Sequence, residues 1–126
     1  MSLRHSYRFF AGSAVALIIV LSLGPSKQAR AAELVIFEST ACEWCEIWQD
    51  EVGEFYDKTS EAEIVPLRRV DIDDDRPDDL KHVNGIVYTP TFIIMKEGQE
   101  VGRIIGYPGE DFFWQLLNEI LLKLKS

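Results

Sequence analysis

Residues 33–45, ELVIFESTACEWC, decide how the rest of the chain is interpreted. The first seven of these residues form an apolar run rich in β-forming side chains, which is typical of a buried strand. A helix is predicted to begin directly after this run, with Thr40 as its N-cap and Glu43 completing a capping box. The only two cysteines of the chain, Cys42 and Cys45, therefore fall where the strand gives way to the helix.

The segments that follow predict alternating strands and helices. Apolar spacings of three and four continue the first helix, and Gly53 is a point at which it can be interrupted. A second strand is predicted over 62–73, where Pro66 indicates an irregularity or a sheet edge, and a loop with a short helix follows. Residues 91–95 and 100–106 flank KEGQ, which predicts a hairpin. The apolar positions of the first helix are Ala41, Cys45, Trp48, Val52, Phe55 and Tyr56.

Taken in order, the predicted elements are β-α-β-α-β-β-α, ending in a helix with acidic residues early and lysines late. A strand–helix–strand crossover is right-handed and makes the first two strands parallel, and the final hairpin adds an antiparallel pair. The sequence therefore predicts an α/β fold with a central mixed four-stranded sheet and helices on both faces. Phe112 and Trp114 are expected to pack at the start of the last helix, with partner docking as the alternative.

Residues 1–31 have the pattern of a cleaved secretory signal peptide. Two arginines precede a 13-residue apolar run, and Ala29 and Ala31 occupy the A-x-A positions of a cleavage site. We therefore expect one domain over 32–126 and a periplasmic location. The alternative is an uncleaved membrane anchor, although a full span needs ~20 apolar residues and the stretch 9–24 has only 16.

The chain that remains after such cleavage is strongly acidic. The export segment holds four of the 13 basic residues and none of the 21 acidic ones, which leaves nine basic residues and a net charge of −12. A nucleic-acid partner is disfavoured, because phosphate binding needs a concentrated positive surface. An acidic surface instead favours solubility and steers the protein towards basic patches on partner proteins.

The C-x-x-C spacing favours redox chemistry over a metal site or haem attachment. A zinc site needs about four ligands, whereas the chain beyond residue 31 offers no third cysteine and one histidine, His82. Haem attachment requires histidine directly after the second cysteine, where Glu46 stands. A structural disulfide stays open as an alternative, although so short a loop stabilises a fold little. We expect no metal, and no cofactor beyond a redox-active Cys42–Cys45 disulfide.

The position of each cysteine on the predicted helix indicates its role. Cys42 is expected to be the second helical residue, where unpaired N–H groups and the helix dipole stabilise a thiolate. Cys45 lies one turn further along, on the same face and more buried. Cys42 is thus predicted to be the exposed nucleophile that attacks a substrate disulfide, and Cys45 to resolve the mixed disulfide. Trp44 is interpreted as part of a substrate-binding platform, with a core position as the alternative.

The wider sequence resembles the thioredoxin superfamily. The matching stretches are LVIFES-TACEWC, RRVDID and NGIVYTPTFIIMKEGQEVGRIIGY, which together span nearly all of the chain after residue 31. The resemblance implies a cis peptide bond before Pro90, with Thr89 offering backbone groups to a substrate strand. It also implies that Gly106 flanks the same docking surface.

The chain departs from the pattern of that superfamily at several positions. Ile36 stands where many members bury an aspartate that assists proton transfer, and Arg69 corresponds to a lysine that often pairs with it. Glu38 is the nearest alternative acid, but strand alternation leaves open whether it faces the cysteines. Ala41 replaces a common tryptophan before the first cysteine.

Four shorter motifs are similar to the sequences of the small periplasmic SoxS-type thioredoxins of bacterial sulfur-oxidation systems. These motifs are CEWCE, PLRRVDI, TPTF and GRIIGYPGEDFFW. This likeness implies a monomeric reductase of a protein thiol or disulfide, with the sulfur-carrying complex as substrate and a membrane-bound electron donor. Glu43 also favours a reductase over a strong oxidant, because a neighbouring negative charge raises the pKa of a thiol. The alternative function is a binding or chaperone module whose disulfide only holds the start of the helix.

Overall fold

One mixed sheet organises the molecule. A computed structural model describes residues 32–126, so the predicted export segment and its cleavage site lie outside the described residues. The strands are β1 (Ala32–Glu38), β2 (Leu67–Asp71), β3 (Thr91–Lys96) and β4 (Gln99–Ile105), in the order β2-β1-β3-β4. Strand β1 runs parallel to β2 and antiparallel to β3, and β3 and β4 form an antiparallel hairpin. The predicted four-stranded mixed sheet is confirmed.

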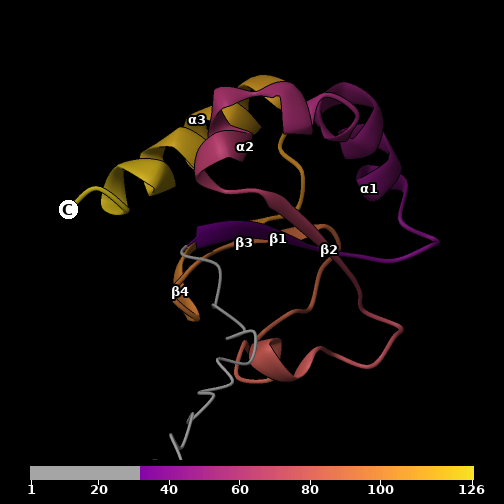
Figure 1. Cartoon of the computed structure of the whole chain (residues 1–126). Helices are drawn as coiled ribbons and strands as arrows, with labels where there is room; N and C mark the ends of the chain where they lie inside the picture. The colour runs from indigo at the N-terminus through magenta and orange to yellow at the C-terminus, as the bar shows by residue number, and fades with distance from the viewer. Residues whose placement is uncertain (1–31) are drawn as a thin grey trace, which may run out of the picture.

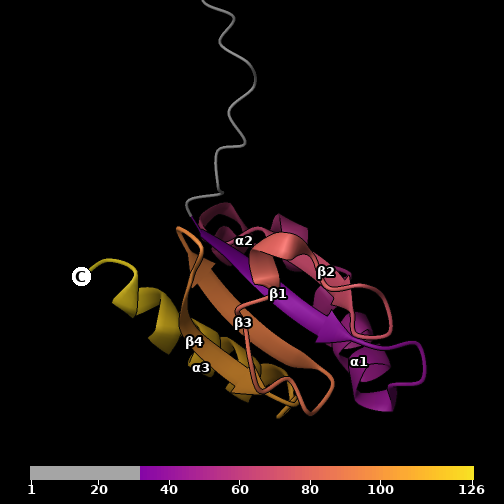
Figure 2. The same cartoon turned by 90° about the horizontal axis from the view of Figure 1, so that it is seen from below.

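Helical segments cover both faces of this sheet, but unequally. Four helical segments follow β1 and precede β2 along the chain. They are helix α1 (Glu43–Trp48), the π-helical turn η1 (Gln49–Gly53), the 3-10 turn η2 (Tyr56–Lys58) and α2 (Ser60–Ile64). The 3-10 turn η3 (Asp78–Leu80) lies between β2 and β3, and α3 (Glu110–Lys123) follows β4. Helices α1, α2 and α3 lie over one face of the sheet, and η3 with its loops lies over the other (Figure 1). Figure 2 shows the same layers from the η3 side.

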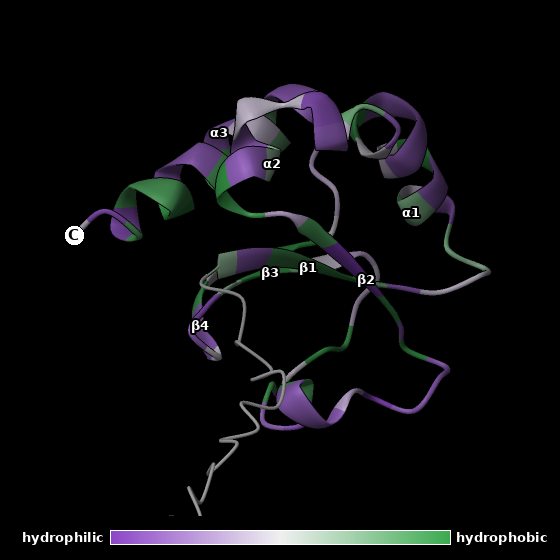
Figure 3. Cartoon of the chain, viewed as in Figure 1, coloured by the Kyte–Doolittle hydropathy of each residue, from purple (hydrophilic) through white to green (hydrophobic). Residues whose placement is uncertain are grey.

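Strand β1 is buried along five consecutive residues because both of its faces are covered. Side chains alternate along a strand, so Leu34 and Ile36 enter the core beneath the α-helices. Val35 and Phe37 enter a second, smaller core beneath η3. In Figure 3 the central strands β1 and β3 are mainly hydrophobic, whereas the helices alternate between hydrophobic and hydrophilic residues.

The second strand is shorter than the sequence predicts. The expected strand over 62–73 is wrong in its first part, because α2 precedes β2. The hydroxyl oxygen of Thr59 caps α2 by accepting the N–H of Ala62 at 3.2 Å, which favours a helix there. Strand β2 lies at one edge of the sheet. An edge position was one of the two possibilities predicted from Pro66, which directly precedes the strand.

The helix after the cysteines also changes character earlier than expected. It is α-helical for six residues, continues as the π-helical turn η1 and stops at Gly53. A Cβ atom at position 53 would lie 2.7 Å from Cζ3 of Trp48, so glycine permits this close approach. Of the predicted buried positions, Cys45, Trp48, Val52 and Tyr56 are buried, whereas Ala41 and Phe55 are exposed. The π-helical turn and the break after it shift Phe55 off the buried face.

Helix α3 packs on β4 and closes the larger core. A Cβ atom at Gly102 in β4 would lie 2.9 Å from Cγ2 of Ile120, which shows how closely helix and strand approach. Trp114 stacks on Tyr56 with ring centroids 6.1 Å apart, as a packing residue should. The same expectation is wrong for Phe112, which is 63% exposed because it falls on the outer side of the first turn of α3.

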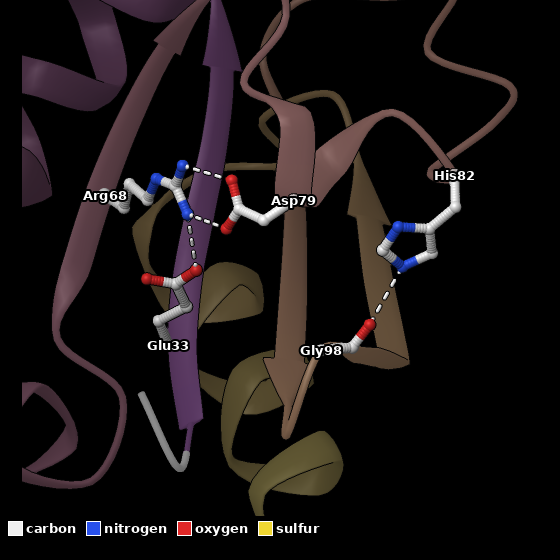
Figure 4. A network of polar contacts seen from close by, with 5 residues as sticks. All are labelled: Glu33, Arg68, Asp79, His82 and Gly98. Atoms are coloured by element: carbon white, nitrogen blue, oxygen red, sulfur yellow. Dashed lines mark hydrogen bonds and ion pairs between the residues drawn. The ribbon is translucent and has the colours of Figure 1, made fainter. Parts of the chain in front are cut away.

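Polar contacts fasten the η3 segment to the sheet (Figure 4). The guanidinium of Arg68 donates two hydrogen bonds to the Asp79 carboxylate, at 2.7 and 2.9 Å, and one to Glu33 at 3.0 Å. His82 is exposed, and its Nε2 lies 2.8 Å from the carbonyl oxygen of Gly98. The hydrogen bonds from Arg68 hold the pKa of Asp79 below its usual value.

The acidic run 71–75 forms a turn at the surface, in which Asp71 Oδ1 accepts the N–H of Asp73 at 2.9 Å. Across residues 32–126, no group of three or more His, Cys, Asp or Glu side chains is arranged to hold a metal ion. Within the same range, no helix combines the length and the apolar character that crossing a membrane requires.

Candidate active site

The two cysteines lie just beyond the end of β1. Cys42 and Cys45 form a disulfide with an S–S distance of 2.04 Å and Cα atoms 5.2 Å apart. Cys42 is itself the N-cap of α1, because its Sγ accepts the backbone N–H of Cys45 at 3.1 Å. The predicted cap at Thr40 is therefore wrong, and so is the placement of Cys42 as the second helical residue. The sulfur takes the place of the capping oxygen.

The two cysteines are almost equally buried in this oxidised state. Cys42 is 7% exposed and Cys45 is 5% exposed, so the expected exposure of the first cysteine is not found. The closed disulfide holds Cys42 Sγ against Cys45 and leaves little of either side chain accessible. The roles of nucleophile and resolving thiol stay predictions, and they depend on the position of Cys42 at the helix start.

Trp44 projects from the surface between the cysteines. Its side chain is 57% exposed, whereas Trp48, one turn further along the helix, is fully buried. A core position for Trp44 is thus excluded, and its indole is accessible to a bound partner. Glu43 and Glu46 are exposed beside it, so the side chains adjacent in sequence to the two cysteines within α1 are aromatic or acidic.

The Thr89–Pro90 peptide bond is cis. It lies at the end of the sheet where β1 ends and β3 begins, which is also the end where the cysteines lie. Strands β1 and β3 pair with Phe37 opposite Thr91, so the chain leaving β1 is adjacent to the chain entering β3. Ser39 Oγ and Thr89 Oγ1 lie 3.5 Å apart across this junction. Thr89 is thereby placed next to the segment that leads into the cysteine pair.

Gly106 follows β4 and lies at the same end of the sheet. Its N–H donates to the carbonyl oxygen of Pro90 at 2.8 Å, and its φ of +75° is one that glycine adopts without strain. The last β4 residue, Ile105, pairs with Thr91. Three of the predicted substrate-binding residues, Thr89, Pro90 and Gly106, are therefore neighbours in space, and Trp44 lies on the helix that starts beside them.

Glu38 and Arg69 form an ion pair on the face of the sheet that carries α1. Ile36 belongs to the core beneath the α-helices, and Glu38, two residues later, shares its face. Arg69 is the β2 partner of Ile36, and its guanidinium donates to Glu38 at 3.0 and 3.1 Å. It also bonds the side chain of Gln49 and lies 5.5 Å from the Trp48 ring. The pair therefore fastens the first helix to the edge strand.

The pair Tyr107 and Glu51 was not identified in the sequence. The Tyr107 hydroxyl donates to Glu51 Oε2 at 2.5 Å and joins the β4–α3 connection to η1. Burial raises the pKa of Tyr107 above its ordinary value, and the hydrogen bond and charge of Glu51 raise it further. The two residues are 56 positions apart, so neither periodicity nor a local motif relates them.

The geometry suits reversible dithiol–disulfide exchange. The disulfide spans one helical turn, and its first sulfur already accepts a backbone N–H. After reduction, the same N–H would donate to a thiolate, and hydrogen bonds to a charged group are about twice as strong as those to a neutral one. The cis Thr89–Pro90 segment lies at the same end of the sheet.

Comparison with known proteins gives a consistent result. Residues 25–121 match the thioredoxin-like domain family. The chain is similar to the reduced form of the periplasmic thioredoxin SoxS from Paracoccus pantotrophus, with 36% sequence identity and a TM-score of 0.68. That likeness covers 73% of this chain and 97% of the other.

Two further solved structures share the fold. The thioredoxin of Fasciola hepatica is 25% identical, over 70% of this chain and 79% of its own, with a TM-score of 0.55. The thioredoxin of Malassezia sympodialis is 24% identical, over 71% of this chain and 76% of its own, with a TM-score of 0.59, and shows the fold alone. No curated protein matches the chain.

Proposed function

Because the chain belongs to the thioredoxin-like family and is a thiol–disulfide oxidoreductase, we propose that it acts as a periplasmic reductase of a protein disulfide. The observation that carries the proposal is the Cys42–Cys45 disulfide at the start of α1, at the end of the sheet where Thr89 and Pro90 also lie. Exposed Glu43 and Glu46 beside the cysteines support reduction over oxidation, because they disfavour a strongly stabilised thiolate.

The reaction passes two electrons from the protein to its substrate. The Cys42 thiolate attacks one sulfur of the substrate disulfide, forming a mixed disulfide and releasing the other sulfur, which takes up a proton. The Cys45 thiol loses its proton and attacks Cys42 Sγ, which closes the disulfide and frees the second substrate thiol. The N–H of Cys45, which points at Cys42 Sγ, stabilises the attacking thiolate.

Four residues are proposed to bind the substrate segment. Trp44 offers an exposed aromatic surface next to the disulfide. Thr89 offers backbone groups for strand-like pairing with the substrate. Pro90 holds this segment in place, because its carbonyl oxygen accepts the N–H of Gly106 at 2.8 Å, and Gly106 leaves room beside it because it has no side chain. No cofactor other than the disulfide takes part in this scheme.

The cellular role proposed here is reduction of a protein disulfide, which returns a cysteine to its thiol form, within sulfur oxidation. The 36% identity to the periplasmic thioredoxin SoxS supports a periplasmic location. The similarity of CEWCE, PLRRVDI and GRIIGYPGEDFFW to SoxS-type proteins supports the sulfur-carrying complex as substrate. A membrane-bound thiol donor would return the electrons, because the disulfide must be reduced again after each turnover.

The near-complete burial of both cysteines favours one other candidate, a binding module with a structural disulfide. Trapping distinguishes the two. Reduced Cys45→Ser protein is mixed with a peptide disulfide and analysed by mass spectrometry, with Cys42→Ser as the matched control. A reductase gives a covalent adduct in Cys45→Ser that dithiothreitol releases, and none in Cys42→Ser. If neither variant forms an adduct and the reduced wild type leaves the peptide oxidised, the binding module is correct.

A further inference from the structure

The segments that converge on the disulfide carry negative charge and no positive charge. Residues 38–57, which contain the cysteines, hold seven acidic residues, and residues 104–117 hold two. The third segment, 84–95, contains the cis peptide bond and no charged residue. None of the three contains Lys, Arg or His. These three segments are therefore more one-sided in charge than the chain as a whole.

Most of these acidic side chains are at the surface. Glu38 is partly buried and paired with Arg69 at 3.0 Å, which neutralises both groups. The exposed acidic residues on α1, η1 and the first turn of α3 are called the acidic collar here. The collar consists of Glu43, Glu46, Asp50, Glu51, Glu110 and Asp111.

The two parts of the acidic collar are held together. The Tyr107 hydroxyl donates to Glu51 at 2.5 Å and so ties the β4–α3 connection to η1. Glu110 and Asp111 lie close enough to Tyr107 for their charges to help raise its pKa. The acids of α3 are thus brought to the same side of the molecule as those that follow the cysteines.

Two arginines outside these three segments already have partners. Arg69 is paired with Glu38, and Arg76 donates to the carbonyl oxygen of Val83 at 2.7 Å while stacking on Phe37. The lysines of α3 fall in its last turn and beyond, at the opposite end of the helix from the collar. Lys58, the last residue of η2, is the first basic residue that follows η1 along the chain.

Exposed apolar side chains lie on the same three segments. The most exposed are Val87 at 75%, Tyr88 at 66%, Phe112 at 63%, Ile105 at 60% and Trp44 at 57%. The carbonyl oxygen of Tyr88 accepts the hydroxyl of Thr91, and Ile105 pairs with Thr91 across the hairpin. An apolar contact area with acidic residues around it suits a partner whose contact segment is apolar at its centre and positively charged around it.

We propose that the acidic collar selects, as substrate, a protein cysteine that is flanked by lysine or arginine. This inference rests on the proposed reductase function and specifies its substrate class. Complementary charge raises the rate of encounter by factors of 10–10³ at low ionic strength. Like charge opposes the approach of an acidic segment, so the collar also excludes acidic partners.

Three synthetic peptides of equal length test the proposal. Each carries one central cysteine as a methyl disulfide, flanked on both sides by lysine, serine or glutamate. Reduced protein converts each peptide into its thiol and methanethiol, and the protein gains the Cys42–Cys45 disulfide, so two electrons balance. Second-order rate constants come from acid quenching and mass spectrometry, at about 20 mM and 500 mM ionic strength.

The expected order of rates at low salt is lysine, then serine, then glutamate, with at least a tenfold span. The span should nearly disappear at 500 mM salt, where charges are screened within a few ångströms. The variant Glu110→Gln/Asp111→Asn should reduce the lysine preference severalfold. The control Glu63→Gln/Glu97→Gln removes two exposed acids outside the collar and should leave the preference unchanged.

The outcomes separate this inference from the function on which it rests. Equal rates for the three peptides at low salt would overturn the charge selection while leaving the reductase function intact. An equal loss of preference in the collar and control variants would overturn the collar as its source. Failure to reduce any peptide, including the serine peptide at high salt, would overturn the reductase function and the inference together.

Discussion

Cys42 is the residue on which the chemistry depends, and two opposing influences act on it. Its Sγ accepts the N–H of Cys45, which favours a negative charge on the sulfur. Glu43, the next residue, is exposed and negative, which opposes that charge. The balance between them determines how readily the reduced protein gives up its electrons.

Replacing Glu43 by Gln should make the protein less reducing. Loss of the neighbouring charge stabilises the Cys42 thiolate and hence the reduced form, so the reduction potential should rise by on the order of 10–30 mV. The potential of each variant is measured in a dithiothreitol redox buffer, with Glu63→Gln as a control that changes the net charge equally. An unchanged or more negative potential in Glu43→Gln would show that this glutamate does not act on the cysteine.

At the scale of single residues, the sequence identified the cysteines because their spacing has chemical meaning by itself. The exposure of Trp44 was also predicted correctly, since Trp48 already occupies the buried face of the helix, whereas its role in substrate binding stays a prediction. The contact between Ser39 and Thr89 and the pairing of Arg69 with Glu38 depend on strand register. No local pattern in the chain contains that register, so these contacts required the structure.

Among the elements, the segment before β2 shows where periodicity fails. Ala62 and Val65 are apolar positions that fit a buried strand or a short helix equally well, and short apolar runs are ambiguous in this way. The Thr59 cap settles the local structure as α2. By contrast, the hairpin and α3 were predicted well, because a turn glycine marks the hairpin, and early acidic residues with late lysines mark the helix.

The close packing of α3 on β4 predicts a sharp response at Gly102. A methyl group there would lie 2.9 Å from Cγ2 of Ile120, so Gly102→Ala should destabilise the fold by about 1–3 kcal/mol through overpacking. Urea denaturation followed by circular dichroism measures the change. A loss below about 0.5 kcal/mol would show that helix and strand separate easily.

A double-mutant cycle identifies the contact responsible. Ile120→Ala removes all three side-chain atoms that approach position 102. Gly102→Ala should therefore cost clearly less in the Ile120→Ala background than in the wild type, with a coupling of at least 0.5 kcal/mol. Additive effects would assign the destabilisation to the backbone of β4 instead.

At the scale of the whole molecule, the Arg68–Asp79 ion pair joins the η3 segment to the sheet (Figure 4). The pKa of Asp79 is lowered in the folded state, chiefly by its hydrogen bonds to Arg68. The ion pair therefore stabilises the fold above the unfolded pKa of about 4. Its contribution is lost as the pH falls through the lower folded pKa.

Asp79→Asn should consequently lower stability at pH 7 but not in strong acid. The carboxylate is largely exposed, so the loss at pH 7 should not exceed about 1 kcal/mol. Urea unfolding at pH 7 and pH 2.5 gives the two values, and Asp78→Asn, which removes an exposed carboxylate beside it, is the control. A loss of the same size at both pH values would mean that the effect is not electrostatic.

Part of the overall topology followed from the sequence because each predicted element has few ways to join its neighbours. The parallel pairing of the first two strands and the final hairpin were predicted, whereas the strand order β2-β1-β3-β4, in which the hairpin joins β1 and not β2, required the structure. The unequal covering of the two faces was not predictable, since it depends on how loops 72–77 and 81–90 pack over the sheet around η3.

The central claim is that Cys42 and Cys45 exchange electrons reversibly as a reductase. A redox titration of the protein in glutathione and dithiothreitol buffers, with free thiols counted by alkylation and mass spectrometry, tests it most directly. The account predicts a single two-electron transition between about −270 and −180 mV. A transition above about −150 mV, or a disulfide that does not open reversibly in these buffers, would contradict it.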